Sequence, residues 1–249
     1  YALIAAGNDG LKIHDLTDAW NPVFIGHYSS GSTFQRITAT GDVAWIAVPG
    51  GNTYGIDYST PSAPAEVGTV ALEQSYSSVV SVVANGGSLY FLPYWWPYRN
   101  LPARVFDVRD PANPVETGSF PTAIDALHIS VMGNLAFFAP ASPGLTWRDD
   151  LDAVEILDVS NPARPVDIGR LARTDNEEFR MAIDGETAVL VHQSSFEVFD
   201  ISNPATPALL GSFEIPESQI AIALTGDVLY VGYSHSPIGG YVGGLRVLD

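Results

Sequence analysis

The sequence predicts an all-β protein made of repeated four-stranded antiparallel sheets, and two observations support this prediction. One motif recurs along the chain at intervals of 42 to 51 residues with fixed internal spacing. Between its copies, short apolar runs alternate with tight turns, and no segment keeps the period of a helix. Repetition at this period is typical of proteins in which each repeat forms one supersecondary unit.

The repeated motif is an apolar strand that ends in Asp, a loop rich in Ser, Thr, Asn and Pro, and a second strand that ends near Gly. The motif aspartates are Asp15, Asp57, Asp107, Asp158, Asp200 and Asp249. Pro follows the first five of them by seven residues and Gly follows by eleven. Two constant offsets in five copies are too regular to arise by chance, so the motif marks the structural unit.

Each residue type in the motif has an expected structural role. Asp at a strand end accepts hydrogen bonds from backbone N–H groups of the following turn. Pro fixes φ within the loop, and we expect Gly to end the second strand, where the chain leaves for the next unit. The six aspartates are therefore assigned to the scaffold rather than to a ring of functional carboxylates.

Each unit contains four predicted strands, A to D in chain order. The A–B turns combine Gly with Asp or Asn, as in residues 38–43 and 224–228, which indicates tight hairpins with positive φ. The B strands that follow, such as 43–48 and 187–191, are apolar on both sides and must be covered on both faces. Four-stranded sheets of this kind at this period predict the blades of a β-propeller.

Counting strands gives six B and six C strands but five A and five D strands. The first blade lacks A and the last lacks D, with blades at about 1–28, 34–70, 76–120, 126–171, 179–213 and 219–249. We therefore predict one propeller domain over residues 1–249, with six blades, or seven if more sequence belongs to the ring. We expect the chain to be a fragment whose continuation supplies the missing strands.

The motif resembles the LVIVD repeat, named for the strand that reads VEILD at 154–158, FEVFD at 196–200 and LRVLD at 245–249. Two copies depart from the pattern: Ala19 replaces the first Pro of the loop, and the strand at 54–58 is weaker. The resemblance implies a β-propeller of a bacterial or archaeal protein that is secreted or displayed at the cell surface. It implies a binding role and brings no catalytic residues.

The composition excludes several classes of function. Asp and Glu total 28 against 11 Lys and Arg, giving a net charge of −17, so nucleic acid and anionic membranes are disfavoured partners. The absence of Cys excludes disulfides, thiolate nucleophiles and zinc–thiolate sites. No apolar run reaches the roughly 18 residues of a transmembrane segment.

Variable loops carried by a rigid scaffold are the expected place for a site, and here the B–C and D–A loops vary. The B–C loops of blades 3 and 4 carry an aromatic group with one cation: Tyr94, Trp95, Trp96, Tyr98, Arg99 and Trp147. Flat rings beside hydrogen-bonding groups suit a sugar ring or a protein hot spot. The alternative is that these rings cover the blades or a missing part of the protein.

Acidic residues gather in the blade-4 B–C loop and the D–A loop that follows it. They are Asp149, Asp150, Asp152, Asp175, Glu177 and Glu178. Clustered carboxylate oxygens suit Ca²⁺, which takes six to eight oxygen ligands. The alternative to a calcium site is a solvated acidic face.

The A strands place three cationic or titratable residues at one offset from their turn glycines: Arg36, His128 and Arg180. Because A strands line the channel of a propeller, these side chains are candidates for an anion site at the channel mouth. The alternatives are simple ion pairing and a strand register that turns these side chains outward.

The sequence favours a non-catalytic role, because it contains no G-x-S-x-G elbow, no H-E-x-x-H motif and no P-loop. The first hypothesis is a secreted or cell-surface propeller that binds proteins or acts as a scaffold through its B–C and D–A loop face. The second is carbohydrate binding by the loop tryptophans, with or without calcium. The third is a hydrolase or lyase at the channel mouth.

Overall fold

The computed structural model describes most of the chain, and it contains strands and no helix in this part. The described residues are 1–18, 20–72, 78–94, 101–121, 126–140, 153–172, 180–192, 195–214, 218–226, 228–235 and 242–248. They form two compact units. Unit 1 comprises Tyr1–Thr122, Leu127–Gly133 and Ser160–Pro165, and unit 2 comprises Ala123–Ala126, Asn134–Val159 and Val166–Asp249.

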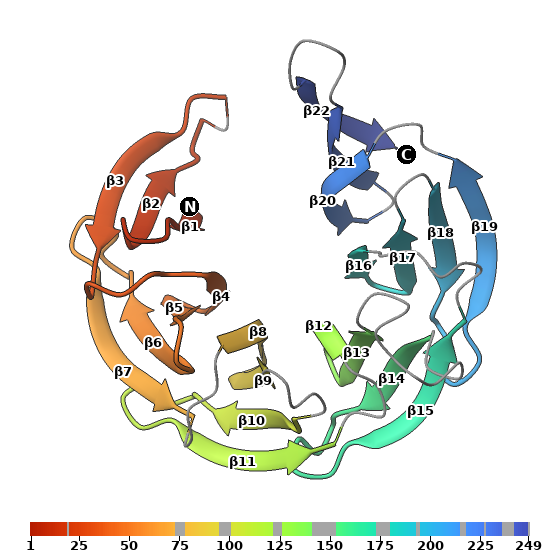
Figure 1. Cartoon of the computed structure of the whole chain (residues 1–249), viewed down its shortest axis with the longest axis horizontal. Coiled ribbons are helices and arrows are strands. Elements are labelled where there is room, and N and C mark those ends of the chain that lie inside the picture. Colours follow the sequence, from red (N-terminus) through yellow and green to blue (C-terminus); the bar gives the residue numbers. More distant parts are fainter. Residues whose placement is uncertain are drawn as a thin grey trace. The chain divides into compact units, whose positions relative to one another are not determined.

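In the described part of the chain, six antiparallel sheets follow one another (Figure 1). The first sheet has β1 (Ala2–Ala5), β2 (Leu11–Asp15) and β3 (Val23–Tyr28), and the second has β4 (Arg36–Thr40), β5 (Val43–Ala47), β6 (Asn52–Asp57) and β7 (Ala65–Ala71). The third has β8 (Ser78–Asn85), β9 (Ser88–Tyr94), β10 (Ala103–Asp107) and β11 (Val115–Phe120). The fourth has β12 (Ala126–Met132), β13 (Leu135–Pro140), β14 (Val154–Asp158) and β15 (Val166–Leu171).

The last two sheets continue the pattern. The fifth has β16 (Arg180–Asp184), β17 (Thr187–Val191), β18 (Ser195–Asp200) and β19 (Ala208–Glu214), and the sixth has β20 (Ser218–Thr225), β21 (Val228–His235) and β22 (Val242–Leu248). In every sheet the strands pair in chain order. The predicted class, an all-β protein with the blades of a β-propeller, is confirmed.

The first and last sheets are the incomplete ones. Asp15 ends β2 and Gly26 lies in β3, so β1 to β3 are B, C and D strands and the first sheet has no A strand among the described residues. The sixth sheet contains A, B and C strands in β20 to β22 and, in the described part, no D strand. Both gaps stand where the strand count predicts them.

The A–B hairpins have the predicted conformation. Thr40 pairs with Val43 across the two-residue turn, and Gly41 adopts a φ of 55°. Gly133, Gly185 and Gly226 take nearly the same φ in the corresponding turns. A positive φ costs glycine little and other residues considerably more, which explains why this position repeats as Gly.

The B strands form the centre of the core, as their apolar composition predicts. In unit 1, Trp45 of β5 is fully buried in a cluster that includes Leu89 and Phe91 of the next sheet. In unit 2, Val189 of β17 and Val231 of β21 pack in the corresponding cluster of the fifth and sixth sheets. In both clusters, side chains from two adjacent sheets pack against each other.

Hydrogen bonds also join the first strands of adjacent sheets in unit 1. Arg36 Nε donates to Val80 O over 3.1 Å, and Ala84 N donates to Thr38 Oγ1 over 3.0 Å. Asn85 Nδ2 donates to Gly133 O over 2.7 Å, which joins the third sheet to the fourth. Neighbouring sheets are thus connected through backbone and side-chain bonds as well as through the core.

Candidate functional site

The loops between the C and D strands share one backbone geometry, built by two consecutive turns. In the first turn the motif Asp accepts a hydrogen bond from the N–H two residues on, as Asp57 does from Ser59 over 2.7 Å. Asp15, Asp107 and Asp200 accept the same bond. In the second turn, Asn113 N donates to Asp110 O over 3.1 Å, and the other four loops repeat this bond. The structural role predicted for the aspartates is confirmed at these positions.

These hydrogen bonds favour the ionised form of the motif aspartates. Bonds donated by Thr17 lower the pKa of Asp15, and bonds donated by Ser202 lower the pKa of Asp200. The side-chain hydrogen bond from Arg109, together with its backbone N–H, lowers the pKa of Asp107 to about 2. The ionised carboxylates therefore serve to stabilise their turns.

The repeated Gly has a different role from the one expected. Gly26, Gly68, Gly118 and Gly169 lie inside their D strands rather than at the ends. At each of them, a Cβ would collide with the backbone of the C–D loop of the next sheet: at Gly169 it would lie 2.0 Å from Pro204 O. The prediction that Gly ends the strand is therefore wrong. Gly is required because the neighbouring loop approaches the strand backbone directly.

In the C–D loop of the first sheet, the residue five positions after the motif Asp is much larger than in the other loops. The position five residues after the motif Asp is Ser or Ala in four loops: Ser62, Ala112, Ala163 and Ala205. In the first loop it is Trp20, which is 98% exposed. Trp20 N donates to Asp18 Oδ1 over 3.0 Å, as Ala112 N does to Asp110 Oδ1 over 3.1 Å. The turn is therefore the same, and only the side chain has changed.

Three further exposed apolar side chains lie near Trp20 in the sequence. Phe24 of β3 is exposed and occupies the position that holds Glu66, Glu116 or Asp167 in the next three sheets. Val23 beside it is exposed, and Leu16, which follows the motif Asp, is 38% exposed. We call Leu16, Trp20, Val23 and Phe24 the first-sheet patch. Two of these four residues differ in type from their counterparts in other sheets: Trp20 stands where the others have Ser or Ala, and Phe24 where the next three have Glu or Asp.

Two residues of the patch, Phe24 and Trp20, have contacts that order them. His14 pairs with Phe24 across β2 and β3, and their rings meet edge to face with centroids 5.5 Å apart. Asp18 fixes the turn below Trp20. The sequence contains the signal for this patch, because aligning the five loops on the motif Asp shows Trp20 opposite three alanines and a serine. The predicted face, made of B–C and D–A loops, does not include it.

The predicted inner-strand group consists of exposed side chains. Arg36 and His128 are exposed in unit 1, on strands β4 and β12, and Arg180 is exposed at the start of β16 in unit 2. The guanidinium of Arg36 donates to the carbonyls of Val80 and Gln35, so part of its hydrogen-bonding capacity serves the scaffold. The anion site stays a prediction.

The other predicted sites lie outside the described residues. This applies to Trp95, Trp96, Tyr98, Arg99 and Trp147 and to the side chain of Tyr94. It also applies to the acidic set Asp149, Asp150, Asp152, Asp175, Glu177 and Glu178. The carbohydrate and calcium hypotheses remain predictions from the sequence.

One buried ionisable pair was not predicted as a pair. His192 follows β17 and Glu197 lies in β18, and their Nε2 and Oε2 atoms are 3.1 Å apart. Both side chains are almost fully buried in unit 2. The pair joins the end of a B strand to the adjacent C strand, which fits a role in packing.

Comparison with known proteins supports the fold. The chain matches the LVIVD repeat at residues 31–71, 125–172 and 183–214. No curated protein sequence matches it. In the described residues no helix has the length and hydrophobicity needed to span a membrane.

Several solved structures are similar. One is a functionally unknown protein from Desulfotomaculum acetoxidans DSM 771, with a TM-score of 0.70 and 14% identity, covering 96% of this chain and 75% of that one. Another is the periplasmic gluconolactonase PpgL of Pseudomonas aeruginosa, with a TM-score of 0.64 and 13% identity, covering 99% and 81%. The computationally designed protein Ika8 has a TM-score of 0.64 and 12% identity, covering 93% and 64%.

Sequence identities this low indicate that the proteins share a fold, and they do not indicate a shared activity. The repeat match is the more specific finding, because it covers three copies of the motif, those of Asp57, Asp158 and Asp200, with their prolines and glycines. The chain thus carries LVIVD repeats and forms the blades of a β-propeller.

Proposed function

We propose that the chain is a protein-binding module and that the first-sheet patch is the surface on which its partner docks. The observation that carries the proposal is Trp20, which is 98% exposed on a turn where four other repeats have Ser or Ala. Tryptophan is the residue type most enriched at the energetic centres of protein interfaces. Its rigid ring also gives a large contact area with little loss of side-chain entropy.

The scaffold suits this role, since it holds the patch in place before a partner arrives. Trp20 stands on a turn whose backbone is fixed by Asp18, and Phe24 stands on a strand paired with β2. A surface that is ordered beforehand loses less conformational freedom on binding than a flexible loop. Trp20 and Phe24 therefore each stand on an ordered part of the backbone.

The charge of the chain indicates the chemistry of the partner. Asp15 and Asp18 flank the patch, and the whole chain carries a net charge of −17. A partner surface with an apolar pocket bordered by Lys or Arg complements both features. Association with such a partner slows as salt is added, because screening weakens the long-range attraction.

The proposal includes a secreted or cell-surface location, which the LVIVD resemblance implies. Catalysis is not part of it. The gluconolactonase of Pseudomonas aeruginosa has a similar fold at 13% identity, which supports a shared fold alone.

Site-specific crosslinking tests the proposal. A photo-reactive p-benzoylphenylalanine replaces Trp20 in cells that make the protein, and the crosslinked partner is identified by mass spectrometry. The matched control places the same group at Val115, which is 59% exposed at the position equivalent to Val23. We expect a partner that crosslinks from position 20 and not from position 115.

The purified partner then gives a quantitative test. Trp20→Ala should weaken its binding by about 30-fold or more, the loss typical of a hot-spot residue, while Val115→Ala should change it less than about threefold. Equal crosslinking from both positions, or full affinity in Trp20→Ala, would contradict the proposal.

A further inference from the structure

Asn85, the last residue of β8, is the one asparagine in the sequence that is followed by glycine. Asparagine is chemically labile, and a following glycine promotes its deamidation because no side chain hinders attack by the glycine nitrogen. We propose that Asn85 is a site of spontaneous deamidation and that the fold accepts aspartate, but not isoaspartate, at this position. The reaction consumes water and needs no enzyme or cofactor.

The reaction has two steps. The Gly86 nitrogen attacks Cγ of Asn85, and the side-chain nitrogen leaves as ammonia after taking up the proton of the Gly86 nitrogen. Water then opens the cyclic succinimide that has formed. If the bond to Cγ breaks, the product is aspartate with the original main chain. If the bond to the main-chain carbonyl carbon breaks, the product is isoaspartate, whose main chain runs through the former side chain.

The A–B turn of the third sheet exposes the attacking nitrogen. Asn85 pairs with Ser88, so Gly86 and Gly87 form the turn, with φ values of 55° and 81°. Gly86 is exposed, and within the described residues its nitrogen donates no hydrogen bond. A Cβ at this position would meet no atom within 4 Å. Water therefore reaches the turn, and two consecutive glycines let its backbone adopt the conformation that ring closure requires.

One hydrogen bond holds the amide that has to react. Asn85 Nδ2 donates to Gly133 O over 2.7 Å, and this bond joins the turn to the A–B turn of the fourth sheet within unit 1. Ring closure requires Cγ to rotate towards the Gly86 nitrogen, so the bond has to open first. Because the bond is exposed and competes with water, its net contribution is modest. We expect the folded chain to react, though more slowly than the unfolded chain.

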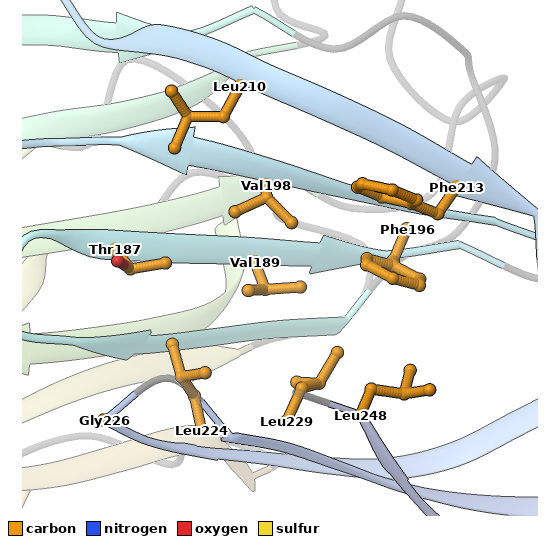
Figure 2. Close-up of a pocket in the computed structure, with 10 residues that line it drawn as sticks. All are labelled: Thr187, Val189, Phe196, Val198, Leu210, Phe213, Leu224, Gly226, Leu229 and Leu248. Atoms are coloured by element: carbon orange, nitrogen blue, oxygen red, sulfur yellow. The ribbon is translucent and has the colours of Figure 1, made fainter.

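The fifth sheet shows what an aspartate does at this position. Asp184 also stands directly before its turn glycine, and its Oδ2 accepts a hydrogen bond from Gly226 N of the next sheet over 2.6 Å. Figure 2 shows Gly226 among the residues that line a cavity of about 470 Å³ between the fifth and sixth sheets. Gly133 and Gly226 have φ values of 55° and 56°. An aspartate at position 85 can therefore accept a hydrogen bond from Gly133 N in place of the bond donated to Gly133 O.

Isoaspartate has no counterpart in the other sheets. It lengthens the main chain by a methylene group and turns the former main-chain carbonyl into a carboxylate. The pair of Asn85 and Ser88 closes the hairpin, and Ala84 N beside it donates to Thr38 Oγ1 of the second sheet over 3.0 Å. A longer main chain at residue 85 disturbs both contacts. The two products should therefore differ in stability.

Peptide mapping of aged protein tests the site. The chain of residues 1–249 is incubated in warm, mildly alkaline buffer made with isotopically labelled water, digested in ordinary water and analysed by mass spectrometry. We expect labelled oxygen to replace nitrogen at Asn85 at least about tenfold faster than at Asn134. Asn134 is the matched control, because it is exposed in the next A–B turn but precedes Leu135.

The stability of the products is measured by urea titration. Asn85→Asp should keep the urea midpoint close to that of the unmodified chain, whereas Asn85→Ala, which can form neither hydrogen bond, should lower it. The more acidic fraction of the aged protein is separated by ion exchange, and an isoaspartyl methyltransferase measures its isoaspartate. That fraction should unfold at a lower urea concentration than Asn85→Asp.

Deamidation of the folded chain that is no faster at Asn85 than at Asn134 would overturn the proposed site. Reaction only in the urea-unfolded chain would also overturn it, because the native turn would then be closed to the reaction. If Asn85→Asp is as unstable as Asn85→Ala, the reversed hydrogen bond is refuted. Equal urea midpoints for Asn85→Asp and the isoaspartate-containing fraction would refute the difference between the two products.

Discussion

The carbonyl oxygen of Pro111 lies 1.9 Å from the point where residue 68 would carry its Cβ, so Gly68 is the only residue that fits there without moving backbone. Gly68 is in β7 of the second sheet and Pro111 in the C–D loop of the third. A strand and a loop from consecutive repeats are therefore in direct contact through their main chains.

Gly68→Ala should lower the free energy of unfolding by about 3 kcal/mol, since the added methyl group displaces backbone atoms rather than a flexible side chain. Gly211→Ala is the matched control, because its Cβ meets only the exposed ring of Phe213. It should cost less than about 1 kcal/mol. Urea titration followed by tryptophan fluorescence measures both, and equal losses would contradict the role assigned to the repeated Gly.

The motif aspartates should make the fold sensitive to acid. Hydrogen bonds lower the pKa of Asp15, Asp57, Asp107 and Asp200 in the folded state, for Asp107 to about 2. Because the folded pKa is below the unfolded value of about 3.9, their stabilising contribution is full above that value and is lost as pH falls through the folded pKa.

We therefore expect the urea midpoint to fall steadily below about pH 5. In a variant with Asp57→Asn and Asp200→Asn, the amide oxygen still accepts the turn hydrogen bond without ionising. That variant should lose less stability between about pH 5 and pH 3 than the unmodified chain. The same pH dependence in both proteins would show that other groups are responsible.

The contact between Tyr28 and Glu66 should be visible at high pH. Tyr28 Oη donates to Glu66 Oε2 over 2.8 Å, joining the first sheet to the second. Burial and this carboxylate raise the pKa of Tyr28 to about 12. Because the folded pKa is higher than the unfolded value of about 10, the stabilisation is present below about pH 10 and is lost as pH rises towards 12.

Ultraviolet titration of the phenolates checks this. Tyr28→Phe should remove an ionisation that occurs near pH 12, and Glu66→Gln should move it towards pH 10. At neutral pH, Tyr28→Phe should cost about 0.5–1 kcal/mol, because this hydrogen bond is exposed and competes with water. An unchanged titration above about pH 11 in Tyr28→Phe would refute the assignment.

Truncation to Ala should change the stability of the fold strongly at one tryptophan and hardly at another. Trp45 is fully buried between the second and third sheets, so Trp45→Ala should cost about 3–5 kcal/mol. Trp20 is almost fully exposed, so Trp20→Ala should change stability by less than about 0.5 kcal/mol. Thermal unfolding of the two variants gives the comparison. A large loss in Trp20→Ala would mean that this ring serves the fold rather than a partner.

The spacing of the motif was sufficient to predict most of the fold. Apolar B strands, Gly-containing hairpin turns and the fixed offsets from Asp to Pro and Gly each depend on local interactions. These interactions are encoded within a few residues of one another. The incomplete first and last sheets followed from counting the same strands.

The role of the repeated Gly could not be predicted in this way. Its cause is a carbonyl of the next repeat, about 43 residues further along the chain for Gly68 and Pro111, and no local rule connects them. Gly at the end of a strand is the ordinary expectation, and it was wrong because a contact between sheets decided the residue.

The first-sheet patch was missed for a different reason. Trp20 has nothing unusual in its own segment, and its significance appears only against the small residues at the same position in the other loops. Because functional sites are expected in loops of variable length, the aromatic run from Tyr94 to Arg99 is the stronger candidate in the sequence. Trp20 lies in a loop whose length is constant. The exposure of a side chain also depends on packing that the sequence does not state.

The contact between Gly68 and Pro111 is shared by two consecutive repeats, and this affects how such a chain evolves. Each repeat carries a glycine for its successor and a loop carbonyl for its predecessor. When a repeat is duplicated or deleted as a unit, the two halves of the contact are gained or lost together, and the new neighbours still fit. Blade number can thus change by recombination without compensating mutations, while a substitution at one glycine damages the junction between two blades.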